Sequence, residues 1–408
     1  MTASKQPESS RTLFLDSPES ADHFLSSIEA TAVVAIDTEG ASFHRYVDRI
    51  YLLQLSTDSR HAILDPLKVG SPSKLRTLLE SRDVEVVFHD ADYDLRLLHQ
   101  DYGWRVTNIF DTRVAAQLLG IKAFGLAALL DSYFGVKLDK KHQRADWSMR
   151  PLTADMLDYA SHDTMHLLGL RARLRDALEA KGRWHWAQEE FARLEGTQWE
   201  ADDPGSSFLR LKGARDLSRR ELALLRELVI WRDGVAKGLD RSTFRVVTNE
   251  VLLELSRRAP RSVDELRSIK GIGRSILENR GSEILEAAAR GTAVPEAELP
   301  RFAKAPRWDR DPNFDERVMS LKRVRDDTAA RLDLDPGVLC ARERLEAVAR
   351  AKPRDLEAVR AIPELRLWQI EALGAAFVKA LRDGPVATAE APRNRGPGTV
   401  ESSPYRDD

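Results

Sequence analysis

Four acidic residues and a tyrosine, spread over three segments, are of the types that bind metal ions and position water. Asp37 and Glu39 follow a short apolar run, Asp94 lies in FHDADYDLRLL, and Tyr159 and Asp163 lie in YASHDTMHLL. Carboxylates that meet in space repel one another unless a cation lies between them. Hard divalent cations bind oxygen ligands and neutralise that charge. If the three segments meet, the pattern predicts a site for divalent metal ions.

The elements that carry these residues can be predicted from the spacing of apolar side chains. Asp37 and Glu39 lie two residues apart in a predicted strand, so both carboxylates point to the same face of the sheet. Asp94 lies in a segment whose leucine spacing predicts a helix. Tyr159 and Asp163 are four residues apart in another predicted helix, which places them one turn apart on one face.

Short apolar runs alternate with longer helical patterns through the first half of the chain, which predicts an α/β domain. Strands are expected at Val33–Thr38, Ile50–Ser56, Ala62–Leu64 and Val84–His89. Helices are expected at Lys74–Leu79, Tyr93–Gln100, Arg113–Leu119, Leu126–Phe134 and Ala154–Glu179. The short connection between the second and third strands indicates a hairpin, so a mixed sheet is expected.

The order D-x-E, D and Y-x-x-x-D resembles the DEDD superfamily of 3′→5′ exonucleases, in its tyrosine-bearing branch. The histidine-bearing branch has histidine five residues before the last aspartate, where this chain has Asp158. The segment QRADWSMRPLTADMLDYASHD is similar to the stretch before the last motif of the ribonuclease D family. The resemblance covers most of the chain and implies a ribonuclease H-like exonuclease domain, a mixed sheet flanked by helices.

Two helical units follow, and both resemble the HRDC domain of helicases and ribonuclease D. They share a long first helix, an apolar helix and a proline, so that Pro260 is expected to match Pro353 and Leu266 to match Leu356. The predicted parts are a disordered N-terminus 1–10, an exonuclease domain 11–200, a first HRDC domain 215–293, a linker 294–311, an HRDC-like second domain 312–383 and a disordered tail 384–408.

The resemblance implies two divalent metal ions, Mg²⁺ or Mn²⁺, roughly 4 Å apart. Asp37 would bridge both ions, Glu39 and Asp163 would complete the shell of one, and Asp94 would help to hold the other. Tyr159 would orient the attacking water. Its phenol, with a pKa of about 10, is a poor base at neutral pH and is better suited to position the water than to deprotonate it. The expected products are nucleoside 5′-monophosphates released from a 3′ end.

Contacts with the nucleic acid are expected at Thr38, Phe43, His89, Lys140, Gln143, Arg150, Lys270 and Arg274. Five of them have an alternative: His89 can be structural, the loop cations Lys140 and Arg150 can be solvated, and Lys270 and Arg274 at the IKGIG turn can belong to a solvated face. Trp147 either packs in the core or stacks near a base. The resemblance implies a bulky residue after Glu39, where this chain has Gly40, so the wedge between the last two bases is either Phe43 or a residue elsewhere in the chain.

Composition excludes several classes of protein. The chain has 408 residues, 42% hydrophobic and 31% charged residues and a formal net charge of −2, so nucleic acid would have to bind to local patches. The single cysteine, Cys340, is expected to be a buried thiol in a helix and excludes an intramolecular disulfide. With neither a signal sequence nor a membrane span in the pattern, we expect a cytoplasmic protein.

The leading interpretation is a ribonuclease D-like 3′→5′ exoribonuclease that trims structured RNA, for which tRNA precursors are the typical substrate of the family. One alternative is a 3′→5′ DNA exonuclease of the same superfamily, because the contacts to the 2′-hydroxyl that separate RNA from DNA cannot be located in the sequence. Another is a catalytically silent RNA-binding protein. The sequence has no heptad seam, so we expect a monomer.

Overall fold

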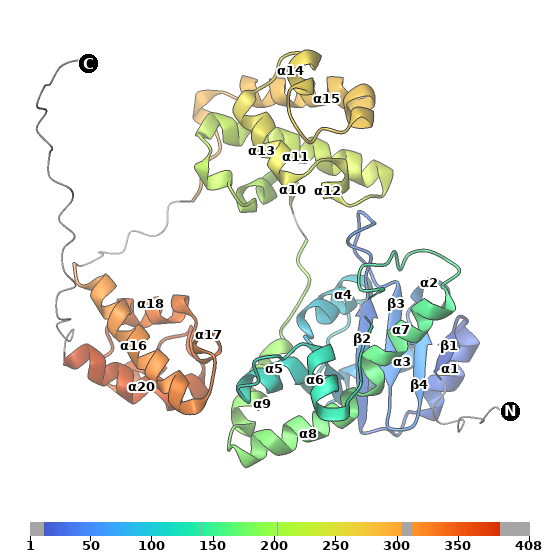
Figure 1. Ribbon diagram of the computed structural model, residues 1–408, viewed down its shortest axis with the longest axis vertical. Coiled ribbons are helices and arrows are strands. Elements are labelled where there is room, and N and C mark those ends of the chain that lie inside the picture. Colours follow the sequence, from blue (N-terminus) through green and yellow to red (C-terminus); the bar gives the residue numbers. More distant parts are fainter. Residues whose placement is uncertain (1–11, 140, 202, 304–311, 384–408) are drawn as a thin grey trace, which may run out of the picture. The chain divides into compact units, whose positions relative to one another are not determined.

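The structure is a computed structural model that describes residues 12–139, 141–201, 203–303 and 312–383 (Figure 1). The segments 1–10 and 384–408, for which disorder is predicted, lie outside the described residues, as does part of the predicted linker. The chain divides into two compact units between residues 308 and 309. Among the described helices, none combines the length and apolar character that a membrane span requires.

A six-stranded sheet forms the centre of the first domain, in the order β1-β4-β3-β2-β5-β6. Its strands are β1 (Leu13–Leu15), β2 (Val33–Glu39), β3 (Leu52–Ser56), β4 (His61–Leu64), β5 (Glu85–Phe88) and β6 (Ile109–Asp111). β3 pairs antiparallel with both β2 and β4, and the remaining neighbours are parallel, so the predicted mixed sheet is confirmed. The two edge strands were not predicted, because three residues are too few to show alternation.

Helices cover both faces of this sheet (Figure 1). They are α1 (Pro18–Ser27), α2 (Pro66–Val69), α3 (Ser73–Glu80), α4 (Asp92–Tyr102), α5 (Thr112–Leu118), α6 (Leu126–Phe134), α7 (Ala154–Met165), α8 (Leu167–Ala180) and α9 (Trp184–Leu194). Val34 and Ile36 of β2 belong to the apolar core that includes Phe24 of α1 and Leu95 of α4. Because side chains alternate along a strand, Asp37 faces the opposite side of the sheet.

The single helix predicted at Ala154–Glu179 is wrong in one respect. It is two helices, α7 and α8, which are separated at His166. α7 packs against β2, β3 and β4, whereas α8 packs against β2 and β5. The apolar spacing continues through the break, so the pattern did not reveal it. The change of helix lets α7 lie across the acidic end of β2.

The chain from residue 203 to 303 is helical. Its elements are α10 (Pro204–Ser207), the short 3₁₀ helices η2 (Phe208–Arg210) and η3 (Ala214–Asp216), α11 (Arg219–Leu239), α12 (Thr243–Val246), α13 (Asn249–Arg258), α14 (Val263–Arg267), α15 (Arg274–Ala293) and η4 (Glu296–Glu298). α11 packs against both α13 and α15. A capping box of Ser218 and Glu221 begins α11 and satisfies amide groups of its first turn.

The second compact unit contains α16 (Phe314–Leu332), α17 (Pro336–Leu339), α18 (Arg342–Ala351), α19 (Leu356–Arg360) and α20 (Leu367–Arg382). It repeats the order of α11 to α15. Leu266 is fully buried six residues after Pro260, and Val359 is fully buried six residues after Pro353. The predicted match of Leu266 with Leu356 is therefore wrong by one helical turn, since Leu356 is 38% exposed.

Cys340 is buried, as expected, but it is not inside a helix. It caps the C-terminus of α17, in an extended conformation just before α18. The apolar residues on both sides of the cysteine resemble one continuous helical pattern, which explains the error. Burial raises the pKa of the Cys340 thiol to about 11, so the thiol is protonated and unreactive at neutral pH.

Candidate active site

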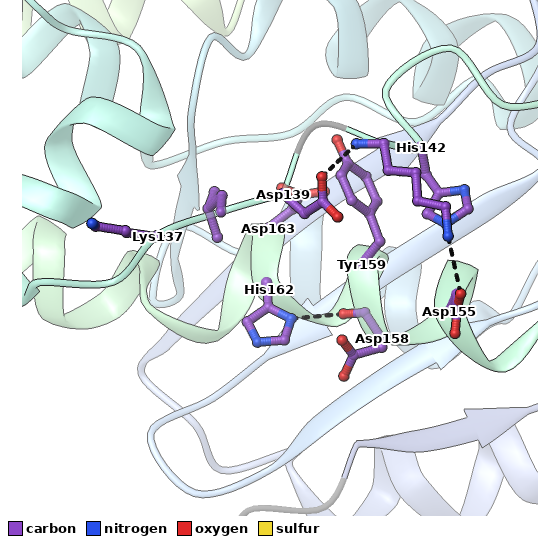
Figure 2. A pocket seen from close by; sticks show the side chains of 10 residues that line it. Lys137, Asp139, His142, Asp155, Asp158, Tyr159, His162 and Asp163 are labelled. Carbon is purple, nitrogen blue, oxygen red and sulfur yellow. Dashed lines mark hydrogen bonds and ion pairs between the residues drawn. The ribbon is translucent and has the colours of Figure 1, made fainter.

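The acidic residues from different segments meet at one end of β2. Asp37, Glu39 and Asp163 each place a carboxylate oxygen within 4.8 Å of the others. β2 presents the first two on one face, and α7 lies across that face and brings the third. Tyr159 lies one turn earlier on α7, and its side chain lines a pocket together with Asp163 (Figure 2). The predicted meeting of β2 with the last motif is therefore present in the fold.

Asp94 lies beside this group, in the first turn of α4, and is only 4% exposed. Its Oδ1 accepts hydrogen bonds from the backbone N–H of Thr38 (2.9 Å) and from the Thr38 hydroxyl (2.6 Å). Thr38 thus ties α4 to β2 between the two acidic residues of that strand. We predicted Thr38 as a nucleic-acid contact, but its hydroxyl is buried and bonded to Asp94.

The four carboxylates raise one another's pKa. Burial is the main cause of the raised pKa of Asp37, and Asp163 adds repulsion. Burial followed by repulsion from Asp37 also raises the pKa of both Glu39 and Asp94. The pKa of Asp163 is raised to about 7 by burial and by Asp94. A site of this kind resists carrying four negative charges by itself.

The donors fit hard divalent cations. The three clustered side chains offer only oxygen atoms, which suit Mg²⁺ or Mn²⁺ better than zinc. Among the described residues, no lysine or arginine forms an ion pair with these carboxylates, so none of the described cations balances their negative charge directly. A bound cation would supply that balance and bring the pKa values down.

Tyr159 packs between two ring systems beside the carboxylates. Its ring centre is 6.0 Å from that of Trp147 and 5.8 Å from that of His142. Trp147 is 1% exposed within an apolar cluster, so of its two predicted roles it has the one in the core. A recess of about 260 Å³ opens here, lined by Tyr159, Asp163 and the loop before α7 (Figure 2). Burial and then Asp163 raise the pKa of Tyr159, so the phenol keeps its proton at neutral pH.

Gln54 is a residue of this site that sequence reasoning missed. It lies opposite Asp37 in the β2–β3 register, which puts both side chains on one face of the sheet. Its side chain is fully buried, and neither amide atom has a partner of good hydrogen-bond geometry among the described residues. The amide is nevertheless close enough to Glu39 to offset part of the rise in pKa that burial causes there. The sequence feature that could have pointed to Gln54 is its position as a polar residue inside the apolar strand YLLQLS.

The glycine that follows Glu39 has a steric explanation. A Cβ atom at Gly40 would lie 2.1 Å from the Tyr93 hydroxyl and 2.6 Å from a carboxylate oxygen of Asp48. That tyrosine donates a hydrogen bond to Asp48 (2.7 Å), which also accepts one from the N–H of Ala41 (3.0 Å). The loop after β2 is therefore held against α4, and this close approach leaves no room for a side chain at position 40.

Two residues predicted to contact nucleic acid are engaged inside the protein. The guanidinium of Arg150 donates to both carboxylate oxygens of Asp65 (2.7 and 2.8 Å) and to the carbonyl oxygens of Tyr51 and Trp147. Asp65 is fully buried, so this pair is structural. Arg150 is therefore engaged with the protein itself, contrary to the phosphate contact that we expected. His89 bonds through Nδ1 to the Thr112 hydroxyl (2.9 Å), and burial lowers its pKa to about 4.

The other predicted contacts differ in how accessible they are. Phe43 is 43% exposed and Gln143 is exposed in the loop before α7, whereas Lys140 lies outside the described residues. Lys270 is exposed at the turn before α15. The adjacent Arg274 is paired with Glu278 (2.7 Å). Further ion pairs join Arg258 to Glu254 and Arg267 to Asp264, so the predicted basic cluster is partly neutralised.

Comparison with known proteins agrees with this geometry. Residues 14–179 match the family model described as 3′-5′ exonuclease, and residues 221–288 and 315–381 each match the HRDC domain. The fold and the acidic site therefore define an exonuclease domain that is followed by two HRDC domains. The predicted fold class is confirmed.

Relatives that match most of the chain narrow the class of exonuclease. Ribonuclease D of Gluconacetobacter diazotrophicus is 32% identical over 355 residues, which are 86% of this chain and 88% of the relative. Ribonuclease D of Granulibacter bethesdensis is 31% identical over 356 residues, with the same coverage. The crystal structure of Escherichia coli RNase D, described as an exoribonuclease involved in structured RNA processing, matches with a TM-score of 0.71 at 25% identity and covers 92% of this chain and 100% of that one. The chain belongs to the ribonuclease D family of 3′→5′ exoribonucleases.

Proposed function

We propose that the chain trims the 3′ ends of structured RNA by hydrolysis that depends on two divalent cations, Mg²⁺ or Mn²⁺. The observation that carries this proposal is the meeting of Asp37, Glu39 and Asp163 within 4.8 Å at the end of β2. The E. coli relative, which is described as acting in structured RNA processing, supports the choice of substrate. By resemblance to the family, tRNA precursors are the expected RNA.

Each residue of the site then has a role. Two bound cations would activate a water molecule and stabilise the leaving oxygen. Asp37, Glu39 and Asp163 would hold the cations, with Asp37 shared between them as the family resemblance implies. Asp94 would assist them, and Thr38 holds the Asp94 carboxylate in place. Tyr159 keeps its proton and orients the attacking water by a hydrogen bond. The water would lose a proton to solvent as its oxygen bonds to phosphorus, and the bond from phosphorus to the 3′ oxygen of the preceding nucleotide would break. The 3′ oxygen would take up a proton from solvent, and a nucleoside 5′-monophosphate would be released.

The recess suggests how structured RNA is trimmed. It is lined by one loop and by one face of α7, which includes Asp163, and its volume is about 260 Å³. A single-stranded 3′ tail would enter until a folded stem stops it. We also propose that the protein works as a monomer.

Two other functions are weighed against this one. A DNA exonuclease of the same superfamily would use the same carboxylates, and RNA is favoured here by the ribonuclease D relatives. A silent RNA-binding protein would have no need for Asp37, Glu39, Asp94 and Asp163 together. The close approach of Asp37, Glu39 and Asp163 and the mutually raised pKa values of the four carboxyl groups support hydrolysis.

A time course with 5′-labelled hairpins that carry a 3′ tail tests the proposal. RNA and DNA versions are incubated with Mg²⁺, with Mn²⁺ and with EDTA, and Asp37→Asn serves as the inactive variant. We expect a metal-dependent ladder on RNA that stops near the stem and is absent with the variant. Faster digestion of the DNA tail would favour the DNA exonuclease, and RNA that is bound but uncut in every lane would favour the binding protein.

A further inference from the structure

The loop that follows β2 contacts the first HRDC domain directly. The hydroxyl of Ser242, just before α12, donates a hydrogen bond to the carbonyl oxygen of Ser42. The hydroxyl of Tyr46 donates to a carboxylate oxygen of Asp233 on α11 (2.7 Å), and its ring packs against the core of that domain. These bonds hold α12 next to the loop that begins at the metal-ligand strand.

Two phenylalanine rings meet at this contact and stay open to solvent. Phe43 of the loop and Phe244 of α12 lie edge to face, with ring centres 6.2 Å apart and planes at 75°. They are 43% and 46% exposed in spite of this contact. Aromatic rings that served only to join the two domains would be covered by neighbouring side chains. Exposed apolar surface at a domain junction is instead typical of a binding site.

Two arginines flank the rings. The guanidinium of Arg144 lies 5.3 Å from the ring centre of Phe43, and Arg245 donates from Nε to the carbonyl oxygen of Phe43 (2.5 Å). Neither guanidinium forms an ion pair with a carboxylate in the part of the chain that the structure describes. The neighbouring Arg45, by contrast, is paired with Asp240 (3.1 Å). Two guanidinium groups without a carboxylate partner among the described residues therefore lie next to the rings.

This surface lies close to the acidic site along the chain. Phe43 follows Glu39 by four residues, so even a fully extended loop would place the two Cα atoms within about 14 Å. Arg144 lies in the loop that leads to α7, the helix of Tyr159 and Asp163. A strand whose 3′ end reaches the carboxylates thus has its preceding nucleotides within reach of the two rings.

We propose that Phe43 and Phe244, flanked by Arg144 and Arg245, form a stacking platform for the bases just upstream of the 3′-terminal nucleotide. The first HRDC domain then completes the substrate site, because it supplies one of the two rings and one of the two cations. Aromatic faces accept any base, and arginines balance the phosphates, which is how single strands are bound without sequence preference. This inference rests on the proposed function.

The platform can be tested by fluorescence. A 3′-tailed RNA hairpin carries 2-aminopurine at the second, third or fourth position from its end, and it is bound to the uncleaving Asp37→Asn protein. Stacking is expected to quench 2-aminopurine at one or more of these positions. Phe244→Ala and Phe244→Leu should lose the quenching and weaken binding about tenfold, since one stacked base contributes a factor in this range. Phe244→Tyr keeps an aromatic ring, so it should quench 2-aminopurine and bind RNA like the parent protein.

A matched control comes from Phe14→Ala, which removes another half-exposed phenylalanine, from the edge strand β1. We expect its affinity and quenching to equal those of the parent protein. Melting temperatures of all variants show whether each is folded. If Phe244→Leu and Phe244→Ala bind and quench like the parent, the rings only join two domains and the platform is wrong. Metal-dependent cleavage by the wild-type chain tests the proposed function separately. A failure of the stacking platform can therefore be told apart from a failure of the proposed nuclease activity.

Discussion

Four buried carboxyl groups that repel one another are the central feature of the site at the scale of single residues. Asp37, Glu39, Asp94 and Asp163 all have raised pKa values, with burial as the main cause in each case. Protonation can relieve this repulsion, and so can a bound divalent cation. Protons and cations should therefore compete for the same site, which links metal binding to pH.

The stability of the metal-free protein should depend on pH with a defined sign. The pKa of Asp163 is about 7 in the folded chain and about 3.9 when unfolded, so the folded state holds more protons between these values. We expect the melting temperature in EDTA to fall by several degrees from pH 5 to pH 7.5, and Mg²⁺ to restore it at pH 7.5. The Asp163→Asn variant should show a shallower fall. Equal slopes in both proteins would contradict the assigned pKa.

The water-positioning role of Tyr159 predicts a separation of catalysis from binding. Tyr159→Phe keeps the ring between Trp147 and His142 and removes only the hydroxyl. We expect single-turnover cleavage to slow by about 100-fold, because a misplaced reactant costs a factor of this order. RNA affinity measured by anisotropy should change less than about twofold. Equal losses in rate and affinity would show that the hydroxyl binds RNA instead.

The acidic residues of the candidate metal site were predictable from the sequence, whereas the residues that hold these carboxylates in place were not. The motif spacing located Asp37 and Asp163 because the chemistry requires acidic side chains on defined faces. Thr38 and Gln54 support neighbouring carboxylates by contacts that depend on strand register and helix placement. Arg150 was misassigned because its sequence position does not reveal the buried partner Asp65.

At the scale of elements, the position of α7 decides whether the site exists. The hydroxyls of Ser56 on β3 and Thr164 on α7 are hydrogen-bonded at 2.7 Å, one residue from Asp163. The loop before α7 is anchored by the ion pair of Arg150 with Asp65. These contacts fix the position of α7 on the sheet. The sequence predicted a helix here but not its position, because strands β1 and β6 and the break at His166 leave no clear pattern in the sequence.

Loss of the Arg150 anchor should destabilise the fold. Arg150→Met leaves the fully buried Asp65 carboxylate without its partner. Breaking such a pair costs about 3 kcal/mol or more, so we expect the free energy of unfolding in urea to fall by that amount. Arg76→Met provides the control, because it removes an exposed pair with Glu80 and should change stability by less than about 0.5 kcal/mol. Similar small effects of both substitutions would contradict the structural role of Arg150.

At the scale of the whole molecule, the chain consists of two compact units that divide at residues 308 and 309. The second unit has its own buried residues, among them Leu321, Val348 and Phe377. The order of an exonuclease domain and two HRDC domains was predictable because each leaves a local pattern. The contact of Phe43 with Phe244 was not, since the two residues are about 200 positions apart and neither belongs to a motif.

Independent folding of the second unit follows from this division. We expect a fragment of residues 312–383 to show helical circular dichroism and a cooperative thermal transition, because its core is formed within the unit. The double variant Leu321→Ala/Phe377→Ala should remove that transition, since both side chains are fully buried. A fragment without a cooperative transition would show that this unit needs the rest of the chain.

The most direct test of the account is single-turnover cleavage of a 3′-tailed RNA as Mg²⁺ is titrated at constant pH. Wild type and Asp37→Asn are compared, with product analysis by chromatography. The account predicts that the wild-type rate rises with more than first-order dependence on Mg²⁺ and yields nucleoside 5′-monophosphates. It also predicts that the variant is at least about 1,000-fold slower, since the cations contribute several kcal/mol to the transition state. Cleavage that persists in EDTA, or that survives in Asp37→Asn, would contradict hydrolysis at this acidic site.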